Sequence, residues 1–291
     1  MKTRRIEFIG HDGSTLSARL DLPTGKPAAF ALFAHCFTCS KDIPAARRIA
    51  QRLASLGIAV FRFDFTGLGH SQGEFANTGF SSNIQDLVLA GQYLRENFQA
   101  PQLLIGHSLG GAAILACAEQ IPEAKAIITI GTPAEPEHVI HNFGQQVDTI
   151  FAEGEAQVHL AGREFTIKRQ FLDDISSNTL AQQIAKVNKA LLVLHAPLDE
   201  TVELDNAARI FQMAKHPKSF ITLDNADHLL TRTEDAEYAA ELISTWVQKY
   251  IKAALLPKTM QVPEGVVRVS ESGANSFTQD ISAAGHHLIA D

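Results

Sequence analysis

Short apolar runs alternate with amphipathic segments along most of the chain, and this alternation limits the folds that the sequence can adopt. The runs are apolar at consecutive positions, which is typical of strands buried on both faces. Two intervening segments, residues 44–56 and 83–94, carry apolar residues at helical spacing. The pattern predicts an α/β fold with a mostly parallel central sheet covered by helices. The predicted strands are residues 29–34, 59–63, 103–105, 126–130, 191–194 and 219–223.

Two segments depart from this alternation. Residues 6–9 and 16–20 flank the turn signal Asp12-Gly13 and predict an antiparallel hairpin that leads into the sheet. Residues 132–189 are far longer than an ordinary connection between a strand and a helix. We interpret them as an inserted cap over the strand ends, with a purely structural excursion as the alternative.

Composition limits the partners and the location. The chain has 291 residues, 45% of them hydrophobic, and a net charge of −7, so we expect no binding to nucleic acid or to a membrane surface. No signal or membrane-spanning segment is evident, and the cysteine count is odd, so we expect a cytoplasmic location. We interpret Cys36 and Cys39 as ordinary buried thiols like Cys117; metal or dithiol chemistry is the alternative, and we expect no metal and no cofactor.

The pentapeptide Gly106-His107-Ser108-Leu109-Gly110 lies between a predicted strand and a small-residue run typical of a helix. A serine on such a sharp turn exposes its hydroxyl above the sheet edge, and the glycines let the backbone pass close to its neighbours. The pattern alone is weak, because glycine and serine are common in turns. With its flanking strand and helix, it makes Ser108 a candidate nucleophile.

A serine hydroxyl needs a base to take its proton and an acid to orient that base. Asp199 and His228 each follow a predicted strand, and in a parallel sheet such loops meet above one edge. We therefore predict that Ser108, His228 and Asp199 act together. The competing residues, which we interpret as structural, solvated or turn-forming, are His107, His195, Glu200, Asp224 and Asp227.

Acyl transfer also needs donors for the negative charge that develops on the carbonyl oxygen. We predict the backbone N–H of Leu109, directly after the serine, as one donor. The second is expected in the loop that follows residues 29–34, and we assign it to the N–H of Phe37.

These residues together resemble the α/β-hydrolase family. The resemblance covers residues 1–255 and includes His35-Cys36-Phe37, residues 64–71 (Asp-Phe-Thr-Gly-Leu-Gly-His-Ser), the serine turn and the loops of Asp199 and His228. Cys36 stands where that family usually has glycine. The resemblance implies an α/β-hydrolase fold and a serine hydrolase that cleaves carboxylic esters of small molecules through an acyl-enzyme, without a cofactor.

Four phenylalanines of the predicted cap could line an apolar pocket for short-acyl or aryl esters: Phe143, Phe151, Phe165 and Phe171. The alternative is that they pack a small core of the cap itself. Two other functions stay open from the sequence. One is a catalytically silent protein that binds a ligand with this fold, and the other is a thiol redox protein that uses Cys36 and Cys39.

The composition changes after residue 255. We predict a linker over residues 256–265 and a short β-hairpin over residues 266–291. This last stretch resembles the opening strands of an OsmC-like domain, without the peroxidatic cysteine pair of that family, and suggests a truncated version of a longer two-domain protein. Its unpaired strand edges predict that it is mobile or packs on a second subunit in a homodimer.

Overall fold

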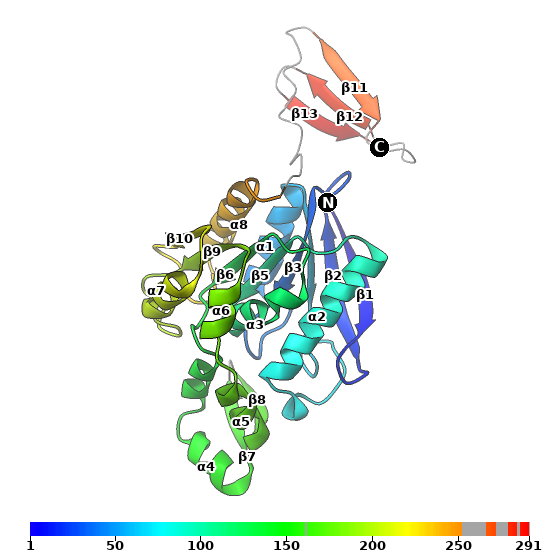
Figure 1. Ribbon diagram of the computed structural model, residues 1–291. Coiled ribbons are helices and arrows are strands. Elements are labelled where there is room, and N and C mark those ends of the chain that lie inside the picture. The colour runs from blue at the N-terminus through cyan, green and yellow to red at the C-terminus, as the bar shows by residue number, and fades with distance from the viewer. Residues whose placement is uncertain (161, 252–265, 272–278, 284–285, 291) are drawn as a thin grey trace.

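An eight-stranded sheet runs through the centre of the computed structural model, which describes residues 1–160, 162–251, 266–271, 279–283 and 286–290 (Figure 1). In spatial order its strands are β1 (Lys2–Ile9), β2 (Thr15–Leu22), β4 (Ile58–Phe63), β3 (Ala29–Ala34), β5 (Leu103–His107), β6 (Ala126–Ile130), β9 (Ala190–His195) and β10 (Lys218–Thr222).

The sheet is parallel from β4 to β10, and β1 and β2 pair antiparallel at one edge. This arrangement confirms the predicted α/β class and the hairpin at the start of the chain. Strand β3 illustrates why the parallel strands are apolar throughout: Phe30 and Leu32 pack into the core on one face, while Ala31 and Phe33 pack into the core on the other.

Helices cover both faces of the sheet (Figure 1). On one face pack α1 (Pro44–Ser55) and α8 (Thr233–Val247). The other face is covered by α2 (Phe80–Asn97), α3 (Leu109–Cys117), α6 (Ala181–Lys186) and α7 (Leu204–Met213). Two short 3₁₀ segments, η1 (Phe75–Asn77) and η2 (Ala118–Gln120), follow β4 and α3 in the chain. Within the described residues, no helix combines the length and the apolar character needed to cross a membrane.

Most of the insertion, residues 132–189, forms a separate lobe, drawn in green below the sheet in Figure 1. It contains η3 (Pro136–Phe143), α4 (Gln146–Glu153), β7 (Glu155–Leu160), β8 (Arg163–Lys168) and α5 (Arg169–Ser177). Strands β7 and β8 form an antiparallel hairpin. Asp174 of α5 accepts hydrogen bonds from the backbone N–H and the hydroxyl of Ser81 at the start of α2. A carboxylate therefore ties the insertion to the body of the protein.

The end of the chain forms three antiparallel strands, β11 (Val267–Glu271), β12 (Gln279–Ala283) and β13 (His286–Ala290). The structure extends the predicted β-hairpin over residues 266–291 by one strand. Strands β11 and β12 pair as a hairpin, and β13 adds a third strand along the other edge of β12. The predicted linker, residues 256–265, lies outside the described residues.

Candidate active site

Three side chains from separate loops form a hydrogen-bonded chain at the carboxyl ends of the strands. Ser108 follows β5, Asp199 follows β9 and His228 follows β10. Nε2 of His228 lies 3.0 Å from Oγ of Ser108, and Nδ1 of His228 lies 2.7 Å from Oδ2 of Asp199. A carboxylate only accepts hydrogen bonds, so Nδ1 carries a proton and Nε2 is free to accept one from the serine. The structure therefore brings together the three residues that the sequence singles out.

The turn that carries Ser108 has a backbone conformation that few residues adopt. Ser108 has a φ of 54° and a ψ of −127°, and only close packing holds a residue other than glycine there. That packing comes from the flanking glycines. A Cβ at Gly106 would lie 2.4 Å from the Cα of Gly111, and one at Gly110 would lie 2.4 Å from the carbonyl oxygen of His35. Glycine is therefore required at both positions for helix α3 to begin so close to β3 and β5.

Asp199 is held as a carboxylate. Burial alone raises the pKa of Asp199, but the hydrogen bond with His228 and the bonds from the N–H groups of Val202 and Thr201 outweigh that effect, and its pKa lies below the ordinary value. Both amides are 2.9 Å from Oδ1. One carboxylate oxygen is thus fixed by the backbone, and the other faces the imidazole.

The competing residues take other roles in the structure. Nε2 of His107 lies 2.7 Å from the carbonyl oxygen of His228, and Nε2 of His195 lies 2.7 Å from the carbonyl oxygen of Val202. Each ring therefore holds the backbone of a loop in place by a hydrogen bond. Three competing acids, each exposed, are Glu200, Asp224 and Asp227.

The two predicted amide donors have no acceptor among the described residues. Neither the N–H of Phe37 nor that of Leu109 donates a hydrogen bond to any of the residues that the structure describes. A small cavity of about 10 Å³ lies beside both residues and is walled by Phe75 and Leu68 as well. That volume accommodates about one water molecule.

Cys36 and Cys39 form a disulfide across Phe37 and Thr38. The prediction that they are ordinary buried thiols is therefore wrong. The two cysteines meet because the loop turns back at Thr38, which has a φ of 57°, and because the N–H of Cys39 donates to the carbonyl oxygen of Cys36. With this pair oxidised, the odd cysteine count no longer argues for a reducing compartment. Cys117 is free, and burial raises the pKa of its thiol to about 12.

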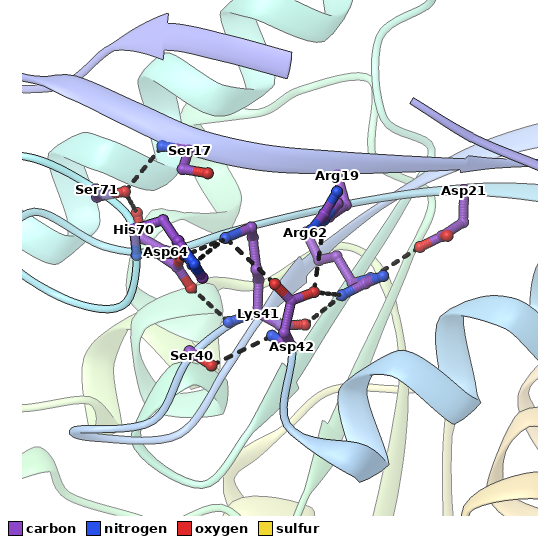
Figure 2. A network of polar contacts seen from close by, with 10 residues as sticks. All are labelled: Ser17, Arg19, Asp21, Ser40, Lys41, Asp42, Arg62, Asp64, His70 and Ser71. Atoms are coloured by element: carbon purple, nitrogen blue, oxygen red, sulfur yellow. Dashed lines mark hydrogen bonds and ion pairs between the residues drawn. The ribbon is translucent and has the colours of Figure 1, made fainter. Parts of the chain in front are cut away.

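A buried ionic network holds the loop that contains Phe37 against the sheet (Figure 2). Nζ of Lys41 lies 2.5 Å from Oδ2 of Asp64, and these residues are 1% and 0% exposed. The guanidinium of Arg62 joins Asp42 to Asp21, at 2.8 Å from each carboxylate. Arg62 also donates to the carbonyl oxygen of Lys41. Charged groups of β2 and β4 thus position the loop that follows β3.

The four phenylalanines of the insertion do not lie together. Phe143 and Phe171 are buried against the ring of Phe37, with centroids 6.1 and 5.3 Å away. Phe165 packs on Phe75 at 4.9 Å. Phe151 is 48% exposed and lies against Arg169 instead. Two of the four rings therefore pack on Phe37 of the proposed oxyanion loop, and Phe165 is joined to Phe37 through Phe75. Contact of these rings with substrate stays a prediction.

Buried histidines make the fold sensitive to acid. Burial, followed by the charge of His228, lowers the pKa of His107 from 6.5 to about 4. Burial also lowers the pKa of His35 and of His195. Between pH 6.5 and 4 the unfolded chain therefore binds protons that the folded chain does not, so the free energy of unfolding falls as the pH falls through this window. For His107 the loss is roughly 3 kcal/mol.

Urea unfolding at pH 7.5 and pH 4.5 measures this effect. His107→Gln keeps a donor for the carbonyl of His228 but cannot titrate, so we expect a smaller loss of stability between the two pH values than in the wild type. His159→Gln, at an exposed position of β7, is the control and should leave the pH dependence unchanged. An unaltered pH dependence in His107→Gln would contradict the assignment.

Comparisons with known proteins agree with the α/β fold described above. The serine aminopeptidase S33 family matches residues 27–161. The crystal structure of the esterase domain of a Rhodothermus marinus protein is 45% identical, with a TM-score of 0.72 over 86% of this chain and all of that domain. Est1E of Butyrivibrio proteoclasticus, solved with ferulic acid, is 21% identical, with a TM-score of 0.73 over 85% of this chain and 99% of that one.

A mitochondrial palmitoyl-protein thioesterase, ABHD10 of Rattus norvegicus, is 25% identical over 199 residues. The match spans 64% of this chain and 64% of the length of the thioesterase.

Among the residues that the structure describes, no group of three or more His, Cys, Asp or Glu side chains is arranged to hold a metal ion.

Proposed function

The chain belongs to the α/β-hydrolase family, and on that premise we propose that it is a serine hydrolase that cleaves carboxylic esters. The observation that carries the proposal is the hydrogen-bonded chain from Ser108 through His228 to Asp199. Along the sequence the three residues occur in the order Ser108, Asp199 and His228, which is the order that this fold uses.

In the proposed mechanism, Oγ of Ser108 attacks the ester carbonyl carbon while Nε2 of His228 takes its proton. The oxyanion accepts hydrogen bonds from the N–H groups of Phe37 and Leu109, which have no other acceptor among the described residues. The protonated His228, stabilised by Asp199, passes its proton to the leaving oxygen as the C–O bond breaks. Water, deprotonated by His228, then attacks the acyl-enzyme and releases the acid and the free serine.

We assign short-acyl or aryl esters as substrates. The support is the apolar cavity beside Leu109 and the aromatic surroundings of Phe37, made by Phe75, Phe143 and Phe171. A cavity of about 10 Å³ leaves little room for a long acyl chain without movement of its walls.

Two measurements test the proposal. A fluorophosphonate probe should label the protein, and mass spectrometry should place the label on Ser108. A panel of p-nitrophenyl and aryl esters of increasing acyl length should give the highest kcat/KM with short or aromatic acyl groups. Absence of both labelling and hydrolysis would leave the alternative of a silent binding protein.

The Cys36–Cys39 disulfide favours a second candidate, a thiol redox protein. The two cysteines have the spacing of redox-active pairs, but Cys36 is only 4% exposed. The variants separate the two candidates. A redox activity would be lost in Cys36→Ser and retained in Ser108→Ala, whereas ester hydrolysis would be lost in Ser108→Ala.

We also propose that residues 266–291 are the start of an OsmC-like domain and are dispensable for hydrolysis. Three short antiparallel strands support the first part. Deletion of residues 262–291 should leave kcat/KM within about twofold, because a unit of three short strands lies outside the proposed machinery. If these strands join two subunits, light scattering should detect a dimer that the deletion converts to a monomer. A large loss of activity in a folded variant would contradict the proposal.

A cytoplasmic location is likewise a proposal, and fractionation of the source cells would test it.

A further inference from the structure

A second, larger cavity lies beside the loop that contains Phe37 and is lined in part by Thr38 and Ser40 of that loop. Its volume is about 410 Å³, within the range of about 300–1,000 Å³ of small-molecule sites. Its apolar wall is made by Ile43, Pro44 and Leu229. Two cationic side chains, Arg48 of α1 and Arg163 of β8, also line it, and none of the lining residues is acidic.

Both guanidinium groups keep donors available. Arg48 donates to the carbonyl oxygen of Thr231 at 2.8 Å, and Arg163 donates to the carbonyl oxygen of Thr38. Within the described part of the chain, no carboxylate lies in ion-pair distance of either side chain. An arginine has five N–H donors, so one bond to a carbonyl oxygen leaves several for a ligand.

The cavity lies next to residues that adjoin the proposed catalytic groups, on the side where the alcohol part of an ester would leave. Two of its lining residues, Leu229 and Thr38, directly follow His228 and Phe37 in the chain. In the proposed mechanism His228 passes its proton to the leaving oxygen, so the leaving group lies on the side of His228. A substituent on that group can extend past Leu229 toward the two arginines.

We propose that this cavity, named here the arginine pocket, binds an anionic oxygen group, a carboxylate or a phosphate, on the leaving alcohol of the substrate. Two guanidinium groups recognise such groups by charge-assisted hydrogen bonds. The apolar wall holds the carbon skeleton between the ester and the anion. This inference rests on the proposed function and specifies the substrate class for it.

The test compares esters that differ at one position. 4-Acetoxybenzoate and 4-acetoxyphenyl phosphate carry the anion, and methyl 4-acetoxybenzoate carries a neutral group in its place. We expect at least one anionic ester to have a kcat/KM at least tenfold above that of the methyl ester, and the better of the two identifies the preferred anion. A preference for the neutral ester over both would overturn the proposal.

Variants of the two arginines then test whether the arginine pocket causes this preference for an anionic ester. Arg163→Gln and Arg48→Gln should each lower kcat/KM for the preferred anionic ester about 10- to 100-fold, and that for the methyl ester by less than about threefold. Arg163→Lys should restore part of the preference. The matched control is Arg47→Gln, one position earlier on the same helix, exposed and outside the cavity lining. Equal losses for anionic and neutral esters would overturn the proposal.

A binding measurement separates this inference from ester hydrolysis itself. Calorimetric titration of 4-hydroxybenzoate and of 4-hydroxyphenyl phosphate into the Ser108→Ala variant needs no turnover. At least one should bind about tenfold more weakly when Arg163 is also replaced by glutamine. If the wild type hydrolyses p-nitrophenyl acetate through Ser108 but these affinities do not change, the arginine pocket is refuted and the hydrolase function stands.

Discussion

Replacement of Ser108 by alanine should lower kcat/KM for p-nitrophenyl acetate by about 10⁴-fold or more. In the proposed mechanism Oγ of Ser108 forms the bond to the acyl group, and no described side chain within reach of Nε2 of His228 replaces it. The residual rate should reflect the oxyanion donors and binding alone, since these remain when a nucleophile is removed. Initial rates at several substrate concentrations give the measurement.

The control is Ser55→Ala, a serine at the end of α1 whose hydroxyl donates to the carbonyl oxygen of Arg52. It should retain the wild-type rate. Circular dichroism and urea unfolding should match between the two variants, so that loss of activity cannot be attributed to loss of fold. A Ser108→Ala protein with near wild-type hydrolysis would mean that another group attacks the ester.

Lys41→Met should lower the free energy of unfolding by roughly 3–5 kcal/mol, because removal of one partner leaves a buried charge without compensation. Asp64 is 0% exposed, and of its neighbours only the N–H groups of Lys41 and His70 would still donate to it. We also expect a lower kcat, since the loop that contains Phe37 follows β3 directly and the network anchors its far end. Urea unfolding and ester kinetics measure the two effects.

Arg52→Met provides the comparison. Arg52 forms an ion pair with Glu241, but both side chains are well exposed, so the change should be within about 1 kcal/mol. Similar losses in the two variants would mean that burial does not strengthen the Lys41–Asp64 pair. The double variant Lys41→Met/Asp64→Leu removes both charges and should recover part of the stability.

The parallel sheet and its helices could be predicted from the sequence because burial on both faces requires strands that are apolar at consecutive positions. The end of β5 differs from the prediction: the strand extends past residue 105 to His107, a polar residue that is 2% exposed and therefore gives no apolar signal. The three residues of the hydrogen-bonded chain could be found because each follows a strand, and the topology then brings such positions to one edge.

Other parts of the site depend on contacts that sequence spacing does not reveal. The disulfide forms because the backbone turns at Thr38, which is a β-branched residue with a positive φ. Lysine is seldom buried, so Lys41 gives no signal of its own. Arg163 reaches Thr38 across 125 positions of sequence. The spacing Cys36-x-x-Cys39 is compatible with a disulfide, but the odd cysteine count favours free thiols.

Left-handed backbone at residues other than glycine is confined, in the described structure, to Thr38, Ser108 and Leu230. Each lies in or beside a loop of the proposed active site, and such conformations cost of order 1–3 kcal/mol each. Glycine at Thr38 or Leu230 would relieve this cost at the expense of a less rigid loop, whereas glycine at Ser108 would also remove the proposed nucleophile. Substitutions meant to raise the thermal stability of this protein therefore belong on the helices that cover the sheet.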